Sequence, residues 1–398
     1  MKWVWRTGLA VVLIVLGAPF FLVAATWTAS GQKAEGQRLE RIKRSPQWKG
    51  DRFDNELARV DGGLDQMLSR FLEDNPGRSP AAPIEIERRR REDFSVPPPS
   101  GLRVTWLGHS TFIIEIDGSR VLIDPVWGER ASPLSWAGPK RFHEPPLPLN
   151  ELPPIDAVVI SHDHYDHLDH PTISQMQRFD TRWLVPLGVG AHLEYWGIDP
   201  SRIEELDWWE SRELGPLTIT CAPARHFSGR SLTSMNATLW SGWALAGPEH
   251  RVFYSGDTAL HPAFEDISEQ LGPFDLSIIE TGAYSPMWSD VHLGPEQALI
   301  AHAMLEAKLL LPAHWGTFDL ALHPWVEPIQ RIRRAALESG AKIVAPRPGG
   351  QVEIDEDVLA MGWVDEWWDS AQGWATVEER PAWSTGVDEL LERSVLYR

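Results

Sequence analysis

The 398-residue chain is long enough for one large domain or two average ones, and its 43% hydrophobic and 23% charged residues are typical of a globular protein. Its formal net charge of −19 at pH 7 argues against a general nucleic-acid-binding protein, because an acidic surface repels a phosphate backbone. Cys221 is the only cysteine in the sequence, which excludes an intramolecular disulfide and any cysteine-based zinc site.

Residues 1–30 are predicted to form an N-terminal membrane anchor or signal segment. Lys2 and Arg6 precede an uncharged apolar stretch over residues 9–27, which is just long enough to span a bilayer. We favour an uncleaved anchor over a signal peptide cleaved near Ala25 or a buried core helix. The basic residues on the two sides of the stretch favour opposite orientations, and we expect the main domain on the periplasmic or extracytoplasmic side.

Residues 31–100 are predicted to be a juxtamembrane linker. The basic side chains between positions 33 and 52 would either contact anionic lipid head groups or lie on a solvated linker. Apolar residues recur at helical spacing over residues 56–73, which predicts a helical stretch there. Arginines at 88–91 and prolines at 97–99 indicate where the linker ends.

Residues 101–350 carry the pattern of an α/β catalytic domain. Strands are predicted over residues 102–107, 112–116, 120–123, 155–160, 183–185, 217–222, 238–244, 251–255, 276–279 and 308–311. Helices are predicted over residues 188–196, 263–271, 295–305 and 325–340, with Pro295 in a first helical turn and Gly340 at a helix end. This order predicts an αββα sandwich of two packed β-sheets with helices on the outer faces.

Two further segments complete the predicted organisation. Residues 125–154 are rich in proline and are predicted to cover one face of the domain as a long loop. Residues 351–398 are acidic and rich in tryptophan, and are predicted to be an extension packed on the domain. Its tryptophans are Trp363, Trp367, Trp368, Trp374 and Trp383.

The most informative motif is the run Ser-His-Asp-His-Tyr-Asp-His-Leu-Asp at residues 161–169, directly after a predicted buried strand. Three histidines and three aspartates at one strand exit are unusual for a solvated loop, and a core does not tolerate them unless they are paired or bound. Imidazole and carboxylate ligands together suit a borderline divalent metal such as zinc. The motif therefore predicts a metal site.

Three other predicted strands end in the same kind of residue. His226 follows the strand at 217–222, Asp257 follows the strand at 251–255, and His314 follows the strand at 308–311. One apolar strand that ends in His or Asp means little by itself. Three such ends together with the His-rich motif favour a shared metal centre over core packing.

With these motifs the chain resembles the metallo-β-lactamase superfamily, whose H-x-H-x-D-H signature matches residues 162–167. Within that superfamily it is similar to N-acyl-phosphatidylethanolamine-hydrolysing phospholipase D and its bacterial relatives. The narrower resemblance rests on Trp-Leu-Gly-His-Ser-Thr at 106–111, Gly-Pro-Lys-Arg-Phe at 138–142, Gly-Asp-Thr at 256–258 and His-Trp-Gly-Thr-Phe at 314–318.

The resemblance implies two Zn²⁺ ions and a ligand set for each. The first zinc would be held by His162, His164 and His226, the second by Asp166, His167 and His314, with Asp257 bridging both. Other divalent transition metals are possible in the same sites.

Further candidates lie around this set. Asp163 is expected to orient a ligand by accepting an imidazole N–H, and Asp169 to cap the next helix or do the same. His109 and His292 are candidate catalytic residues with Asp257; His292 precedes a helix and would contact a substrate phosphate. The remaining histidines are expected at the surface or in the core, namely His170, His192, His261, His302 and His323.

The resemblance implies a membrane-associated phosphodiesterase of the phospholipase D type. It would act on N-acyl-phosphatidylethanolamine-like lipids through a metal-bridging hydroxide. The alternative is a zinc-dependent lactonase or another ester or amide hydrolase of the same superfamily, although Lys140, Arg141 and His292 favour a phosphate-bearing substrate. A non-catalytic, membrane-anchored binding module is the remaining interpretation.

Overall fold

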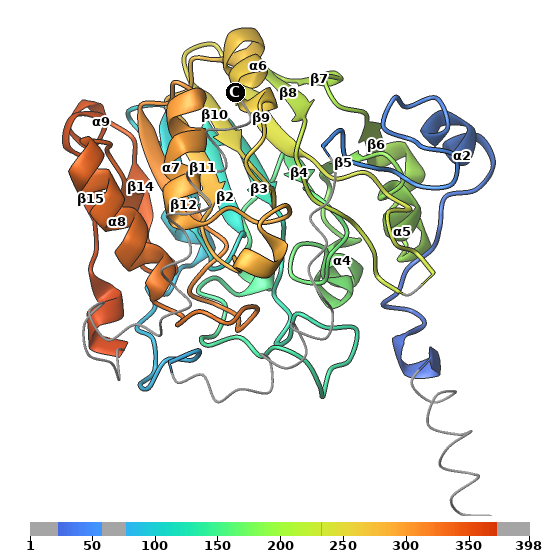
Figure 1. Cartoon of the computed structure of the whole chain (residues 1–398), viewed down its shortest axis with the longest axis horizontal. Coiled ribbons are helices and arrows are strands. Elements are labelled where there is room, and N and C mark those ends of the chain that lie inside the picture. Colours follow the sequence, from blue (N-terminus) through green and yellow to red (C-terminus); the bar gives the residue numbers. More distant parts are fainter. Residues whose placement is uncertain (1–22, 58–76, 232, 372–398) are drawn as a thin grey trace, which may run out of the picture.

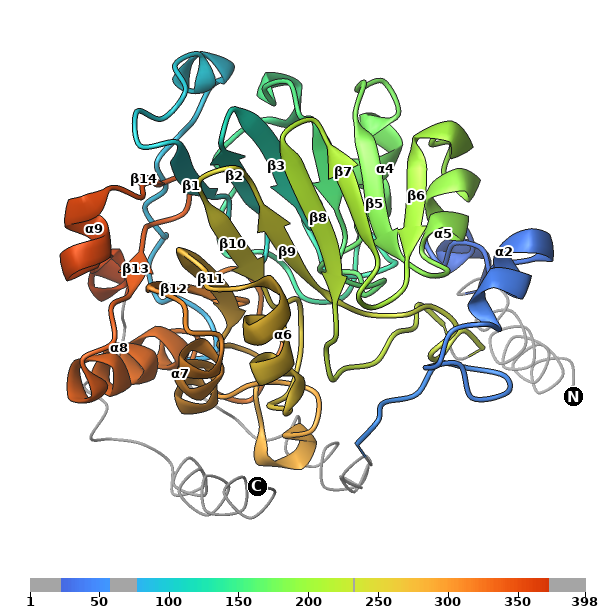
Figure 2. The ribbon, with the colours of Figure 1, turned by 90° about the horizontal axis from the view of Figure 1, so that it is seen from above.

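The computed structural model describes residues 23–57, 77–231 and 233–371 of the chain. In this part the strands form two large sheets and one small one (Figures 1 and 2). The first sheet has the order β14 (Gln351–Glu353), β1 (Leu102–Trp106), β2 (Phe112–Ile116), β3 (Ser119–Ile123), β4 (Ala157–Val159), β5 (Arg182–Pro186) and β6 (Ile203–Leu206). The second has the order β12 (Leu309–Ala313), β11 (Leu276–Glu280), β10 (Arg251–Tyr254), β9 (Gly242–Ala246), β8 (Leu217–Ala222) and β7 (Ser211–Leu214). The small sheet pairs β13 (Val344–Ala345) with β15 (Trp363–Val364).

Helices lie on the outer sides of the two large sheets. The α-helices are α2 (Gly36–Ile42), α4 (His170–Met176), α5 (Gly190–Tyr195), α6 (Ala263–Leu271), α7 (Pro295–Met304), α8 (Glu327–Ser339) and α9 (Glu356–Met361). Short 3-10 helices are η1 (Arg91–Phe94), η2 (Leu149–Glu151), η3 (Pro200–Arg202), η4 (Pro286–Trp288) and η5 (Trp367–Ala371). Figure 2 shows α4 and α5 beside β5 and β6, with α6, α7 and α8 on the opposite side of the molecule.

Two hydrophobic cores hold these layers together. The larger one contains inward-facing residues of both sheets, for example Ile114 of β2 and Leu245 of β9. The smaller one joins the other face of the first sheet to α4 and α5, for example through Val158, Ile173 and Leu193. Each sheet therefore buries both of its faces, and the predicted αββα sandwich is confirmed.

The predicted strands and helices agree with the structure except at a few ends. The predicted strand at 238–244 begins later, at Gly242, because Leu239 and Trp240 bond outside the ladder. The Leu239 amide donates to the Leu187 carbonyl, and the Trp240 indole donates to the Ala224 carbonyl. Pro295 opens α7 and Gly340 ends α8 in the left-handed conformation at φ 76°, both as predicted.

The described part of residues 31–100 packs on the domain instead of forming a free linker. Phe53 is fully buried in the larger core. Arg38 donates to Glu205 at 2.7 Å and to Glu194 at 2.9 Å, so this basic side chain is paired with acidic residues of the domain. The predicted helical stretch at 56–73 lies almost wholly outside the described residues.

The N-terminal and C-terminal predictions are only partly covered by the described residues. The predicted anchor lies mostly outside them, and only 23–27 of its apolar stretch are described. Within the described ranges, no helix is both long and apolar enough to cross a membrane. At the other end, Gln351–Glu353 forms β14 and pairs with β1, so the first sheet includes the beginning of the predicted extension. Trp367 and Trp368 are buried, and Trp367 stacks on Trp315 with ring centroids 5.4 Å apart; Trp374 and Trp383 lie outside the described residues.

His302 on α7 gives the fold a pH-dependent contribution. Its Nδ1 lies 2.8 Å from Ser277 Oγ, and burial lowers the pKa of His302 from 6.5 to about 4. Because the folded-state pKa is the lower one, the neutral imidazole stabilises the fold above pH 6.5, and this contribution is lost as the pH falls towards 4.

Between pH 7 and pH 4 we expect wild-type protein to lose about 3 kcal/mol more unfolding free energy than a His302→Asn variant. Urea denaturation of the metal-free proteins at a series of pH values measures this difference. Parallel pH curves for the two proteins would show that His302 does not contribute in this way.

Candidate metal centre

The loop after β4 of the first sheet brings its histidines together with residues that follow three strands of the second sheet. His162, His164, Asp166 and His167 come from this loop, while His226 follows β8, Asp257 follows β10 and His314 follows β12. All seven predicted ligands fall into two groups whose ligand atoms lie within 4.8 Å of one another. One group is His162, His164, His226 and Asp257; the other is His109, Asp166, His167 and His314.

The first group has nitrogen atoms that point at one another. His164 Nδ1 lies 2.8 Å from His162 Nε2 and 3.2 Å from His226 Nε2. A proton on His164 Nδ1 can form a hydrogen bond with only one of these two nitrogens, so hydrogen bonding does not account for both contacts. Ligands about 2.0–2.1 Å from a tetrahedral zinc lie roughly 3.3 Å apart, so the spacing suits a common cation. Burial lowers the pKa of His162 and His226 well below its ordinary value, which keeps both imidazoles in the neutral form that binds metal.

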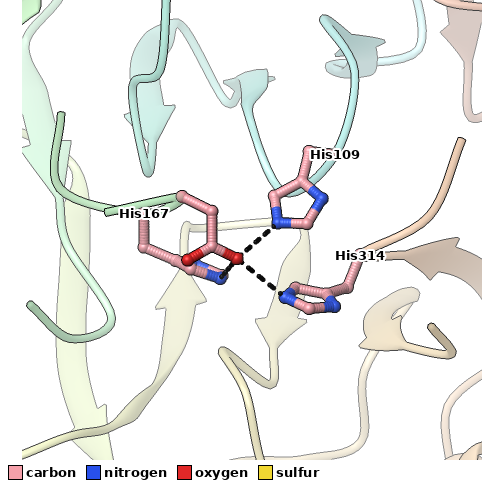
Figure 3. Close-up of side chains that lie close together, drawn as sticks. His109, His167 and His314 are labelled. Carbon is pink, nitrogen blue, oxygen red and sulfur yellow. Dashed lines mark hydrogen bonds and ion pairs between the residues drawn. The ribbon is translucent and has the colours of Figure 1, made fainter. Parts of the chain in front are cut away.

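The second group surrounds the carboxylate of Asp166. Figure 3 shows the rings of His109, His167 and His314 directed at one carboxylate. Asp166 Oδ2 lies 2.9 Å from His109 Nε2, 3.4 Å from His167 Nε2 and 3.3 Å from His314 Nε2. Burial opposes the charged form of His314, but Asp257 and Asp166 outweigh it and raise the pKa of His314 to about 10. The carboxylates of Asp166 and Asp257 therefore favour a positive charge in this group, such as a protonated imidazole or a metal ion.

Asp257 touches both groups. Its Oδ2 lies 3.0 Å from His314 Nε2 and 3.7 Å from His226 Nε2, and its Oδ1 lies 3.2 Å from His167 Nε2. His167 Nε2 and Asp257 Oδ1 are buried and have no hydrogen-bond partner among the residues that the structure describes. Buried polar atoms are nearly always satisfied, so these atoms fit a metal-binding role. The set suits divalent metal ions held between neutral imidazoles and carboxylates.

The ring nitrogens that face away from the centre are fixed by outer partners. His167 Nδ1 donates to Asp124 Oδ2 at 2.7 Å, and His226 Nδ1 donates to the Val291 carbonyl at 2.7 Å. These bonds leave Nε2 of both rings for a metal. Asp124 is itself held by Ser161 and Tyr254, since the Ser161 amide donates to it at 2.7 Å and the Tyr254 hydroxyl at 2.6 Å.

The sequence interpretation missed Asp124. It stands directly after β3, so it carries the same signal as Asp257: an apolar strand that ends in an aspartate. The following Pro125 made it resemble an ordinary turn residue. Its role here is to orient His167, not to bind metal.

The expectations for Asp163 and Asp169 have different outcomes. Asp169 accepts the Thr172 amide at 3.1 Å and caps α4, as predicted. Asp163 does accept an imidazole N–H, but from His192, whose Nε2 lies 3.3 Å away, and not from a predicted ligand. Its other oxygen accepts the Gly229 amide at 2.7 Å. His192 is a buried core residue, one of the two placements expected for it, and it lies behind the His-rich loop.

His292 lies at the mouth of the centre, held by a buried carboxylate. Its Nδ1 is 2.8 Å from Glu280 Oε2 and 3.9 Å from Asp257 Oδ2. Its ring centroid is 5.0 Å from that of His226. Glu280 also accepts the amides of Thr258 and Leu293, so the carboxylate is fixed before it positions His292. Sequence reasoning did not identify Glu280, which is the last residue of the buried strand β11.

The N-terminal segment reaches the same centre from behind. Asn55 Nδ2 donates to the His226 carbonyl at 2.7 Å, and the Gln32 amide donates to His192 Nδ1 at 3.0 Å. The buried guanidinium of Arg230 donates to the carbonyls of Ala29, Asp163 and Leu168. These residues carry no sequence signal, because each contact joins segments far apart in the chain.

Comparison with known proteins assigns this arrangement to a family. Residues 119–315 match the model of the beta-lactamase superfamily domain. An uncharacterised protein of Mycobacterium tuberculosis is 50% identical over 282 residues, covering 69% of this chain and 74% of that protein. N-acyl-phosphatidylethanolamine-hydrolyzing phospholipase D 1 of Caenorhabditis elegans is 40% identical over 247 residues, covering 59% of this chain and 69% of that protein.

A solved structure agrees with the fold. The isothiocyanate hydrolase from Delia radicum gut bacteria has a TM-score of 0.51 and 21% sequence identity, and the match covers 63% of this chain and 98% of that one. At this identity the likeness concerns the fold alone. From the sequence relatives and the His/Asp centre, the chain belongs to the metallo-β-lactamase superfamily of metal-dependent hydrolases and is related to the N-acyl-phosphatidylethanolamine-hydrolysing phospholipases D.

Proposed function

We propose that the protein is a dinuclear zinc phosphodiesterase of the phospholipase D type that acts on N-acyl-phosphatidylethanolamine-like lipids. The observation that carries this proposal is the pair of ligand groups, both approached by the Asp257 carboxylate, in a chain related to phospholipase D 1 of Caenorhabditis elegans. Two metal ions, when bound, would supply an activated water and stabilise charge on the phosphoryl oxygens.

The side chains have distinct roles in this proposal. His162, His164 and His226 hold one metal, and Asp166, His167 and His314 hold the other. Asp257 joins the two groups and fixes their separation. His109 donates to Asp166 from Nε2 and keeps that carboxylate turned towards the centre.

His292 is the proposed proton-transfer residue. Its Nδ1–H donates to Glu280, which leaves Nε2 as the ring nitrogen that exchanges a proton with the leaving group. Glu280 acts through His292 by fixing its tautomer and ring direction. Because the proposed nucleophile is the activated water, the hydrolysis needs no serine or cysteine nucleophile. The only cysteine, Cys221, is buried in the larger core.

Arg141 supports an anionic substrate. Its guanidinium lies over the Phe318 ring at 5.7 Å, and the same ring packs edge-on against His109 with centroids 5.3 Å apart. Nε and Nη1 of Arg141 are buried and have no hydrogen-bond partner within the described part of the chain. Burial lowers the pKa of Arg141 to about 10, so the side chain is still charged at neutral pH. This cation is weakly screened by solvent and is separated from His109 only by the Phe318 ring, so it attracts a negatively charged phosphodiester. The neighbouring Lys140 is instead exposed and paired with Glu129 at 2.7 Å.

An Arg141→Met variant is expected to lose about 10- to 100-fold in kcat/KM towards a phosphodiester, because a charge-assisted contact contributes about 1.5–3 kcal/mol. The loss should appear mainly in KM and be smaller in Arg141→Lys. Lys140→Met serves as the control and should keep wild-type kinetics. Equal kinetics for Arg141→Met and Lys140→Met would exclude this role of Arg141.

Membrane attachment through residues 1–30, with the catalytic domain on the periplasmic or extracytoplasmic side, completes the proposal. It is supported by the apolar stretch at residues 9–27 and by the lipid nature of the proposed substrate. Fractionation of cells that express the full chain tests it, with a chain lacking residues 1–22 as the control. The truncation ends before residue 28 because the carbonyls of Thr28 and Ala29 accept hydrogen bonds from Trp196 and Arg230, and their removal would disturb the domain.

Parallel substrate assays test the reaction itself. Zinc-loaded protein is given vesicles that contain N-acyl-phosphatidylethanolamine and, separately, a lactone of similar chain length. Release of the phosphorylated lipid at a rate well above that of lactone opening is the expected result. Lactone opening without phosphodiester cleavage would favour the carbonyl-directed hydrolase over the phosphodiesterase.

A further inference from the structure

A small cavity is lined in part by His314. Its volume is about 20 Å³, and its lining includes His314, Phe318, Asp319, His323 and Trp325. One ordered water needs at least about 10–15 Å³ measured in this way. The cavity therefore has room for a single water and none for an acyl chain or a lipid head group.

Three polar atoms of the lining residues have no partner. His314 Nδ1, His323 Nε2 and Trp325 Nε1 are all buried and make no hydrogen bond within residues 23–57, 77–231 and 233–371. An unsatisfied buried polar atom costs about 1–3 kcal/mol, so three of them around one cavity need an explanation.

The hydrogen-bonding roles of these atoms can be derived from their other contacts. His314 Nε2 faces Asp257 and Asp166, so a metal bound there leaves the proton on Nδ1, which is then a donor. His323 Nδ1 donates to the Pro324 carbonyl at 2.9 Å, which makes His323 Nε2 an acceptor. Burial lowers the pKa of His323 and keeps its ring neutral near pH 7. The indole nitrogen of Trp325 is a donor only.

Two donors and one acceptor around a water-sized cavity match the hydrogen-bonding capacity of one water molecule. We propose that this cavity is a water-binding subsite in which one water accepts from His314 Nδ1 and Trp325 Nε1 and donates to His323 Nε2. The water fixes the tautomer and ring direction of His314, so that Nε2 is presented to the metal. His323 and Trp325 are then positioning residues for the metal centre, although neither touches it. This inference rests on the proposed role of His314 as a ligand.

Outer partners of metal-bound histidines commonly change metal affinity by 10- to 100-fold when they are removed. Trp325→Phe and His323→Phe are both expected to weaken the binding of zinc at the His314 site by roughly that factor. Competition with a chromophoric chelator measures this affinity. His323→Phe keeps a flat ring against Tyr284, on which His323 stacks at 4.4 Å between centroids. It therefore removes the acceptor with little change in packing.

Trp183→Phe provides a matched control. Trp183 Nε1 is also a buried indole nitrogen that has no partner in the described ranges, but Trp183 lies on β5 in the smaller core. Its replacement removes the same kind of group and should leave zinc affinity unchanged. If Trp325→Phe and His323→Phe bind zinc as tightly as Trp183→Phe, the subsite does not support His314 and the proposal is wrong.

A second readout does not depend on affinity or on activity. In zinc-loaded wild-type protein, ¹⁵N NMR of the His314 imidazole is expected to show a proton on Nδ1, and in His323→Phe this proton should exchange faster with solvent. An unprotonated Nδ1, or zinc that does not bind at His314, would overturn the proposal. Zinc binding with a protonated Nδ1 but no phosphodiester cleavage would leave the subsite intact and contradict only the proposed function.

Discussion

Replacement of Asp257 with alanine is expected to reduce phosphodiester hydrolysis by roughly 1,000-fold or more, because the metal ions contribute several kcal/mol of transition-state stabilisation. The Asp257 carboxylate approaches both ligand groups, since its Oδ2 lies 3.0 Å from His314 Nε2 and 3.7 Å from His226 Nε2. Without it the two sites lose their common ligand and their fixed separation. Bound zinc per chain, measured by elemental analysis after dialysis, should fall together with activity.

Asp117→Ala is the matched control for this experiment. Asp117 also lies beside a histidine, at 2.6 Å from His250 Nδ1. The ligand atoms of Asp117, Glu249 and His250 lie within 4.8 Å of one another, as those of the two metal groups do. Its carboxylate, however, already accepts the amides of Glu249 and His250. The control should keep its zinc content and activity. An Asp257→Ala protein that retains both activity and two metals would contradict the two-metal mechanism.

The second large effect is expected at Arg230, whose replacement with methionine should lower the free energy of unfolding by about 3 kcal/mol or more. The guanidinium is buried and donates to three carbonyls, those of Ala29, Asp163 and Leu168. Methionine fills similar space but leaves these acceptors without a donor. Guanidinium chloride denaturation measures the loss, and the zinc affinity should fall as well, because Asp163 and Leu168 belong to the loop that carries four ligands.

Arg212→Met is the comparison for Arg230→Met. Arg212 pairs with Glu204 at 2.6 Å, but its side chain is 48% exposed, and an exposed ion pair contributes at most about 1 kcal/mol. The two variants should therefore differ in stability by about 2 kcal/mol or more. Equal stabilities would mean that the three bonds of Arg230 do not contribute to the stability of the fold.

The sequence predicted which residues come together at the candidate centre because its signals are local. His226, Asp257 and His314 each follow a strand whose apolar residues are recognisable one by one, and the His-rich motif is continuous. In the second sheet β8, β10 and β12 run in the same direction, so the residues that follow them meet at one edge, and the motif after β4 joins them from the first sheet. The αββα layers followed from the order of strands and helices for the same reason.

Contacts between distant segments could not be predicted in this way. The edge strand β6 carries Glu204 and Glu205, and its charged residues conceal the strand pattern. Asn55 is one polar residue in a segment without periodicity, yet it bonds to the carbonyl of His226. Lys140 and Arg141 are adjacent in the sequence, and only the fold distinguishes the exposed ion pair of Lys140 from the partly buried guanidinium of Arg141 beside Phe318.

Titration of metal-free protein with zinc, followed by both bound metal and phosphodiester cleavage, is the most direct test of the two-metal centre. Two zinc ions per chain are expected, with cleavage of N-acyl-phosphatidylethanolamine appearing as the second ion binds, and with neither effect in Asp257→Ala. Cleavage that persists at full rate in the metal-free protein, or saturation at fewer than two ions with full activity, would contradict the account.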